Sequence, residues 1–319
     1  MNKLLLKISI VICLLGVFPY FTWGQQAVSV TNFKNNPLPK NPTSLKILGI
    51  GNSFTDDGMQ YLPDLLKYAG IDNVTLGRLV RGGCSLEKHH QIYTSGEAGY
   101  PRYEKSYPGK NAWENVKDSC GFVEAVIDEA WDVIVIQQVS ELAGVYGTFQ
   151  PYLNELTDAI ITNCPNAGVT LAWQMTWAYG RDFDHKKVDY YRRDQDIMFH
   201  AIINTVKTLV AETGIDVIIP SATAVRNVRN TALNNPPLDL TRDGYHIDLG
   251  AGRYLLACTW FQTLIAPCFN TSVTGNSFRV DNGNIPVTDN NFEILQKAAV
   301  YAVSRRFEIS PLPPAADGL

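Results

Sequence analysis

The stretch from Leu45 to Asp56 reads LKILGIGNSFTD, an apolar run that ends in Gly-Asn-Ser. Its apolar part, Leu45 to Ile50, predicts a β-strand, and apolar residues with helical spacing follow from Met59 to Ala69. Ser53 therefore lies on the turn between a strand and a helix, where backbone N–H groups near a helix N-terminus stabilise negative charge. A serine at this position is either a nucleophile or a helix N-cap residue.

A second motif near the C-terminal end reads Asp243-Gly244-Tyr245-His246. Residues three apart face the same side of a helical turn, so the carboxylate can accept a hydrogen bond from one imidazole nitrogen. The other nitrogen then remains for a serine hydroxyl. Together with Ser53, this pair supplies the groups that nucleophilic ester hydrolysis requires. The alternative is a surface Asp and His near a turn.

Strands alternate with helices along the rest of the chain. Four further strands are expected at 74–80, 132–136, 169–173 and 217–219, and five further helices at 122–130, 152–162, 188–212, 250–264 and 292–307. Residues 85–117 form a long polar insertion rich in Tyr, Gly and Lys. The alternation predicts an α/β domain with a parallel sheet that binds ligands at the carboxyl ends of its strands.

The N-terminal residues have the pattern of a targeting segment. Lys3 and Lys7 precede an uncharged apolar run from Ile8 to Phe21, and small residues follow. We expect residues 1–24 to be a signal peptide, which places the mature protein in the periplasm or outside the cell with no stable membrane span. The alternative is a retained membrane anchor. An extended lead-in over residues 25–44 and a single domain over residues 45–310 are expected to follow.

The composition is that of an ordinary globular protein, with 45% hydrophobic and 18% charged residues. A net charge of −4 gives no electrostatic reason to expect nucleic acid as a partner. Five cysteines remain after residue 24, and an odd number leaves at least one thiol without an intramolecular partner. Any disulfide pairing stays open at this point.

Gly51-Asn52-Ser53-Phe54 and Asp243-Gly244-Tyr245-His246 resemble the first and last sequence blocks of the SGNH (GDSL-like) hydrolases. The resemblance covers roughly residues 45–267. It implies a flavodoxin-like three-layer α/β/α sandwich with a parallel sheet. It further implies that Ser53 is the nucleophile, His246 the general base and Asp243 the partner that orients the base. This interpretation assigns no metal and no cofactor.

The same resemblance indicates the groups of an oxyanion hole. The backbone N–H of Ser53 is one donor, and Gly83, with Gly82 as the alternative, matches the glycine of the second block. The third block of the family usually contains an Asn after the third strand, and this chain has Gln137 and Gln138 there instead. Some sialate and carbohydrate acetylesterases are similar in this respect, and a Gln amide carries the same donors on a longer arm.

These observations predict an exported serine esterase that removes a small acyl group, most simply acetyl, from an acylated carbohydrate. Trp177 ends the fourth predicted strand and is expected to stack on a sugar ring at the same edge of the sheet. Two alternatives use the same fold: a lipase or thioesterase with the same three residues, and a carbohydrate-binding protein without catalysis.

Overall fold

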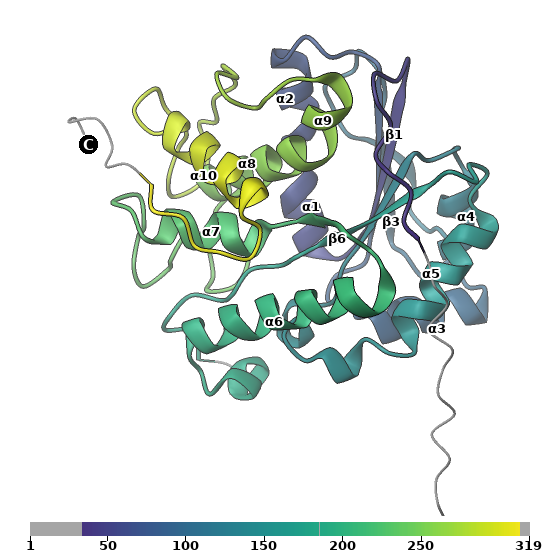
Figure 1. Cartoon of the computed structure of the whole chain (residues 1–319), viewed down its shortest axis with the longest axis horizontal. Coiled ribbons are helices and arrows are strands. Elements are labelled where there is room, and N and C mark those ends of the chain that lie inside the picture. Colours follow the sequence, from purple (N-terminus) through teal and green to yellow (C-terminus); the bar gives the residue numbers. More distant parts are fainter. Residues whose placement is uncertain (1–33, 185, 313–319) are drawn as a thin grey trace, which may run out of the picture. The chain divides into compact units, whose positions relative to one another are not determined.

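A computed structural model describes residues 34–184 and 186–312 of the chain. The described residues form an α/β fold around one seven-stranded sheet in the order β4-β3-β2-β1-β5-β6-β7 (Figure 1). The strands are β1 Leu45–Gly51, β2 Val74–Val80, β3 Arg102–Ser106, β4 Glu114–Lys117, β5 Val133–Ile136, β6 Thr170–Gln174 and β7 Val217–Ile219. The predicted signal peptide at 1–24 lies outside the described residues.

Five of the strands, β2-β1-β5-β6-β7, are parallel and follow the flavodoxin-like order. In this order the direction in which strands are added reverses at β1, and folds of this type bind ligands at the carboxyl ends of the strands where that reversal lies. The run Val133–Ile136 is fully buried in β5, as its lack of polar residues predicts. The predicted fold class, an α/β fold with a mostly parallel sheet, is confirmed.

Helices cover both faces of this sheet. In Figure 1, α1, α2, α8 and α10 lie on one side of the strands, and α4 and α5 lie on the other. The α-helices are α1 Ser53–Met59, α2 Leu62–Tyr68, α3 Leu86–Ser95, α4 Phe122–Ile127, α5 Tyr152–Asn163, α6 Gln195–Thr213, α7 Ser221–Arg229, α8 Ala251–Trp260, α9 Ala266–Phe269 and α10 Phe292–Ser304. Short 3-10 and π-helical turns join several of them.

Several segments differ from the sequence-based expectation, among them helices α1 and α7, which were not expected. The polar insertion at 85–117 folds into α3, β3 and β4, and both strands extend the sheet in antiparallel fashion. Lys105 is buried in β3 because it forms ion pairs with Asp128 and Glu129, so its charge conceals a strand position that faces the interior. The helix expected at 188–212 begins only at Gln195, after Asp194 has capped its first turn.

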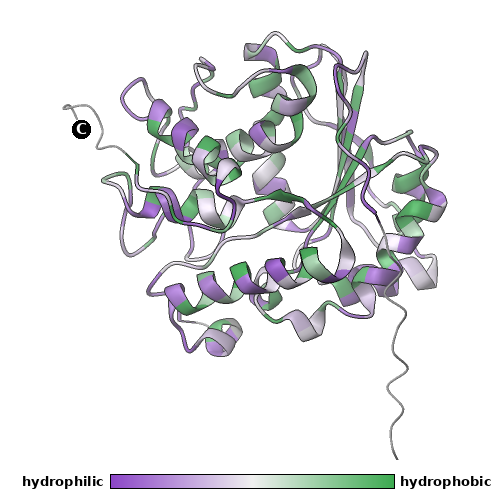
Figure 2. Ribbon diagram, in the orientation of Figure 1, coloured by the Kyte–Doolittle hydropathy of each residue, from purple (hydrophilic) through white to green (hydrophobic). Residues whose placement is uncertain are grey.

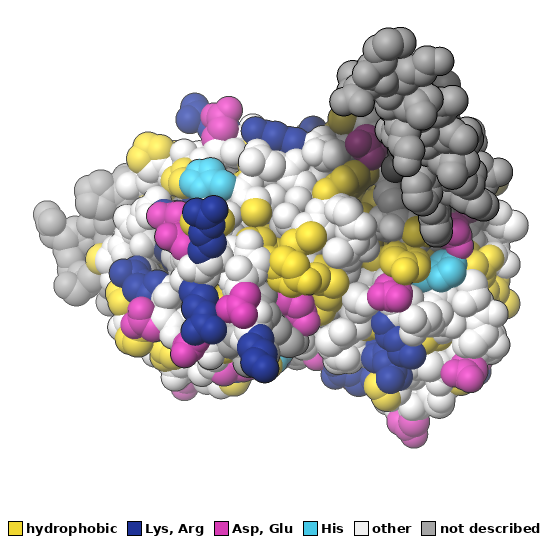
Figure 3. Space-filling model, turned by 90° about the horizontal axis from the view of Figure 1, so that it is seen from below, with side chains coloured by type: hydrophobic (Ala, Val, Ile, Leu, Met, Phe, Trp, Pro, Cys, Tyr) yellow, Lys and Arg dark blue, Asp and Glu magenta, His cyan; other side chains and the backbone are white. Residues whose placement is uncertain are grey.

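Apolar side chains concentrate on the strands and on the helix faces turned toward them (Figure 2). The surface view mixes acidic and basic side chains with small hydrophobic patches (Figure 3). Five cysteines lie within the described residues, and all are buried and free. No helix of the described residues has the length and apolar character that a membrane crossing demands.

Candidate active site

Ser53, His246 and Asp243 form one chain of hydrogen bonds at the carboxyl end of β1. The Ser53 Oγ lies 2.9 Å from Nε2 of His246, and Nδ1 of His246 lies 2.6 Å from Oδ2 of Asp243. Asp243 accepts the Nδ1–H of the ring, so Nε2 is free to accept the serine proton. The two sequence motifs thus meet in one chain of hydrogen bonds, although Ser53 and His246 are 193 residues apart in the sequence.

The loop from Thr241 to Ile247, called the base loop below, holds Asp243 as an ionised hydrogen-bond acceptor. Its Oδ1 accepts the backbone N–H groups of Tyr245 and His246 at 3.2 and 2.8 Å. Partial burial raises the pKa of Asp243, but the hydrogen bonds from the His246 ring and from these two N–H groups outweigh burial and lower it. Gly244 adopts a φ of +94°, which glycine allows, so that the chain can turn between Asp243 and His246.

Asn52 organises the turn that carries Ser53, and sequence reasoning gave it no role. Its Oδ1 caps α1 by accepting the N–H of Phe54 at 2.9 Å, and its Nδ2 donates to the carbonyl of Cys84 at 3.1 Å. This second bond joins the turn that carries Ser53 to the turn of Gly82 and Gly83. The signal in the sequence was an Asn directly before a short helix, which is a typical N-cap pattern.

Gly83 lies on an exposed turn that closes with a hydrogen bond from the Cys84 N–H to the Arg81 carbonyl at 3.2 Å. Its φ of +62° is the left-handed conformation that such a turn needs, and an added Cβ would meet no neighbouring atom. Conformation rather than space therefore favours glycine here. Gly51 is the opposite case, because a Cβ there would lie 2.1 Å from Oγ1 of Thr55.

Gln137 does not present its amide to the reaction centre in this structure. Its side chain is fully buried between β1 and β5, where Nε2 donates to Oδ1 of Asn52 at 2.8 Å. The Oε1 atom accepts the hydroxyl of Thr55 at 2.7 Å. Gln137 thus supports the Asn52 cap, and its second N–H faces the carbonyl of Gln138 at 3.5 Å, within the protein.

Gln138 is also committed to bonds within the protein. Its Oε1 accepts the N–H groups of Leu86 and Val139, both at 2.9 Å. Its Nε2 donates to the carbonyl and the hydroxyl of Thr148, both at 3.2 Å. The prediction that one of the two glutamines donates to the oxyanion is therefore not supported by the geometry. Through their hydrogen bonds, both amides instead connect the segments that follow β1, β2 and β5.

Trp177 is fully buried, which corrects the prediction that it stacks on a sugar ring. Its indole stacks on Phe54, the residue after Ser53, with ring centroids 4.1 Å apart. Its Nε1–H donates to the carbonyl of Tyr245, the residue before His246, at 2.8 Å. Trp177 therefore connects helix α1 to the base loop. The half-buried Tyr245, whose ring centroid lies 3.9 Å from that of His246, is the aromatic residue beside the base.

Asp57 forms a second tie between the same two segments, and sequence reasoning missed it. It lies one helical turn after Ser53, with a side chain only 1% exposed. Arg242, the residue before Asp243, reaches both of its carboxylate oxygens at 3.1 and 3.2 Å. Arg253 of α8 donates to it at 2.8 Å. The sequence shows two consecutive aspartates at 56 and 57, but no neighbouring residue indicates which arginines pair with them.

Titratable groups elsewhere do not assemble a metal site among the described residues. His89, which adjoins His90 in the sequence, is buried and bonded to the hydroxyl of Tyr100 through Nδ1. Burial, with a smaller contribution from Arg81, lowers the pKa of His89 to about 3 and keeps the ring neutral. This histidine belongs to the core beneath α3.

Fold and site together define an α/β protein with a Ser-His-Asp arrangement at the edge of a parallel sheet. The chain belongs to the DUF4886 family, described as a domain of unknown function, whose model matches residues 46–302. The structure of a DUF4886 family protein from Bacteroides uniformis ATCC 8492 is similar, with 33% identity and a TM-score of 0.75. That match covers 84% of this chain and 97% of the other.

More distant similarity extends to other solved structures. A protein from Slackia heliotrinireducens, proposed to be an SGNH hydrolase, has 21% identity and a TM-score of 0.45 over 69% of this chain and 98% of its own. The acetylxylan esterase Axe2 from Geobacillus stearothermophilus has 14% identity and a TM-score of 0.46 over 71% of this chain and 96% of its own. No curated protein matches this chain.

Proposed function

We propose that this protein is a serine ester hydrolase in which Ser53 is the nucleophile, His246 the general base and Asp243 its orienting partner. The observation that carries the proposal is the continuous hydrogen-bonded chain from the Ser53 hydroxyl through His246 to Asp243. Nucleophile, base and orienting group within hydrogen-bond reach of each other are the arrangement by which a serine is activated. The position of Ser53 at the start of α1 adds a favourable dipole.

The reaction would run in two steps. In the first, Ser53 Oγ bonds to the ester carbonyl carbon while its proton passes to Nε2 of His246, and that proton then goes to the alcohol oxygen as the ester bond breaks. In the second, water gives a proton to His246 and attacks the acyl-serine, which releases the acid and restores the hydroxyl. Asp243 stabilises the imidazolium that forms in both steps.

The oxyanion hole in this proposal consists of backbone N–H groups. Ser53 and Gly83 provide the donors, because the amides of Gln137 and Gln138 are engaged elsewhere. Asn52 supports this arrangement by bonding the turn of Ser53 to the carbonyl of Cys84, directly after Gly83. Preorganised donors of this kind stabilise the negative charge of the transition state without any rearrangement at the moment of reaction.

We further propose that the leaving group is a carbohydrate, that the acyl group is small, most simply acetyl, and that the protein is exported. The resemblance of the two motifs to SGNH hydrolases and the N-terminal targeting pattern support these points. The half-buried ring of Tyr245 beside His246 supplies the aromatic surface that Trp177 does not. Aromatic faces of this kind suit sugar rings.

The test is a panel of esters with one chromogenic alcohol and acyl chains of increasing length. Acetyl should be preferred, and Ser53→Ala should abolish turnover while circular dichroism shows an intact fold. A preference for long chains would replace the proposal with a lipase or thioesterase. Undiminished activity of a folded Ser53→Ala protein would refute the nucleophile and with it the mechanism.

A further inference from the structure

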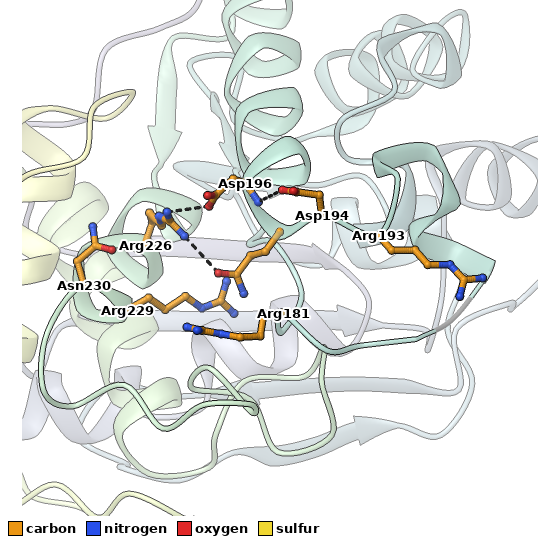
Figure 4. Close-up of a pocket in the computed structure, with 8 residues that line it drawn as sticks. Arg181, Arg193, Asp194, Asp196, Arg226, Arg229 and Asn230 are labelled. Atoms are coloured by element: carbon orange, nitrogen blue, oxygen red, sulfur yellow. Dashed lines mark hydrogen bonds and ion pairs between the residues drawn. The ribbon is translucent and has the colours of Figure 1, made fainter.

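A polar pocket lies near the base loop, and the proposed reaction does not use it. Its volume is about 390 Å³, and Figure 4 shows its lining. The lining comes from the loop after β6, the start of α6 and the end of α7, and consists of Arg181, Arg193, Asp194, Gln195, Asp196, Arg226, Arg229 and Asn230. Four of these eight residues are arginines, which is an unusual concentration of cations in one hollow.

Arg229 is the member of this set whose position most needs an explanation. It is only 7% exposed, and its hydrogen bonds go to the backbone carbonyls of Ala178 and Asp239, both at 2.9 Å. Within the described residues its Nη2 is buried without a hydrogen-bond partner. A buried guanidinium that contacts neutral carbonyls and leaves one nitrogen unpaired is costly for the fold.

The charges around Arg229 do not compensate for this cost. Burial lowers its pKa to about 9, Asp239 raises it, and both Arg226 and Arg181 lower it again by repulsion. Arg181 already shares Asp239, which is fully buried, and Arg226 pairs with Asp196 at 2.7 Å. Arg181, Arg226 and Arg229 thus lie beside three acids, Asp194, Asp196 and Asp239, but within the described residues Arg229 has no ion pair of its own.

Arg226 repeats the pattern seen at Arg229. Its Nη groups reach Asp196 and the Oε1 of Gln195, but its Nε is buried and has no hydrogen-bond partner among the described residues. Figure 4 shows Arg181, Arg226 and Arg229 converging on the hollow, while Arg193 points away from it. Arg193 instead forms ion pairs with Asp184 and Asp189.

We propose that this pocket is a binding site for a carboxylate, held by Arg181, Arg226 and Arg229. Planar guanidinium groups bind carboxylates in a bidentate manner, which suits a cluster with unpaired N–H groups. A singly charged carboxylate would supply the ion-pair partner that Arg229 lacks among the described residues. The nearby acids Asp194 and Asp196 disfavour an anion with two charges, such as phosphate at neutral pH.

The site adjoins the proposed reaction centre but does not depend on it. Gly180, the residue before Arg181, donates its N–H to the carbonyl of Gly244 in the base loop at 2.6 Å. The loop after β6 lies at the carboxyl edge of the sheet, where ligands bind in folds of this type. The carboxylate could belong to an acidic sugar unit or to a free small carboxylic acid, and the binding experiment separates these sources.

The experiment is isothermal titration calorimetry of the full chain with sodium D-glucuronate, sodium acetate, D-glucose and inorganic phosphate at constant ionic strength. Glucuronate should bind saturably and glucose should not. Acetate as strong as glucuronate would indicate a general carboxylate site, and weaker acetate would indicate an acidic sugar. Arg226→Gln and Arg181→Gln should each weaken glucuronate binding about tenfold or more, since each removes a charged donor.

Arg193→Gln is the matched control, because it removes an arginine from the same rim that points away from the pocket. Its affinity for glucuronate should stay within about twofold of the unmodified protein, as expected of a surface ion pair. Equal weakening by this control, equal binding of glucose, tighter binding of phosphate, or no binding of glucuronate would each overturn the inference. Ester turnover of the same samples is measured separately, so failure of the esterase proposal remains distinguishable.

Discussion

Replacement of Asp57 by Asn tests whether the buried carboxylate positions the base loop. The side chain keeps its shape, but an amide N–H₂ group takes the place of an oxygen that accepts from Arg242 or Arg253. The substitution therefore removes one charge and turns an attractive contact into one between two donors. Burial raises the pKa of Asp57 while both arginines oppose that effect, so the carboxylate depends on its two partners.

The expected loss of stability follows from the burial of the ion pairs. Arg242 and Arg253 have side chains 27% and 18% exposed, and the carboxylate is 1% exposed. Breaking such a pair by removing one partner costs about 3–5 kcal/mol. This is a large part of a typical unfolding free energy of about 5–15 kcal/mol. For a domain of this size it corresponds to a fall in Tm of roughly 6–20 °C.

Activity should fall as well, because Arg242 directly precedes Asp243. A displacement of about 1 Å at a catalytic group can cost about 100-fold in rate, so kcat should drop by about 10- to 100-fold. Thermal unfolding and ester hydrolysis well below the new Tm measure the two effects. Asp56→Asn is the control, since Asp56 pairs with Arg78 and Arg102 instead of the base loop. It should lower Tm and leave kcat unchanged. An unaltered kcat for Asp57→Asn would refute the positioning role.

Three further predictions concern the site itself. His246→Ala should reduce kcat nearly as much as loss of the nucleophile and Asp243→Asn should reduce it less, because the groups act as a unit; equal activity of all variants in stopped assays would contradict this. The pKa of Asp243 is lowered in the folded state, so its stabilising contribution should be present above about pH 4 and disappear at lower pH. Denaturant unfolding between pH 3 and 7 measures this contribution. The difference in unfolding free energy between Asp243→Asn and the parent protein should vanish in acid. Gln137→Ala should lower kcat by disturbing Asn52, and Gln138→Ala should mainly lower Tm; a large kcat loss with intact stability in either variant would restore the amide as an oxyanion donor.

The five parallel strands of the sheet and the proposed reacting groups were accessible from the sequence because short-range patterns specify them. The apolar run from Leu45 to Ile50 predicted the strand before Ser53, and β1 spans Leu45–Gly51, although helix α1 and its cap by Asn52 were not predicted. Asp243 and His246 are three residues apart, and their mutual bond depends only on the local turn. The pairing of the two motifs required the further assumption of a parallel sheet, which the alternation of strands and helices supplied.

The elements that were missed lack such patterns. Helix α7, which spans Ser221–Arg229, is buried along most of its length although it carries two arginines, a serine, a threonine and an Asn. Several of its polar groups bond to residues far away in the sequence, as when Arg229 donates to the carbonyl of Ala178 and Thr223 donates to the carbonyl of Arg306. Lys105 in β3 reads as a surface residue for the same reason. The pattern of apolar and polar residues does not predict a buried element when its polar groups bond to partners far away in the sequence.

Trp177 shows how a correct position can still give the wrong role. The sequence places it just after a strand, at the edge of the sheet, and a large aromatic there suits either a ligand or the core. Trp177 and its partner Tyr245 are 68 residues apart in the sequence, and Asp57 and its partner Arg242 are 185 residues apart. Both contacts join α1 to the base loop, one through an indole and one through an ion pair. Ser53 and His246 approach to 2.9 Å because these two ties restrain the same pair of segments from different sides, and local sequence preferences contain no trace of either tie.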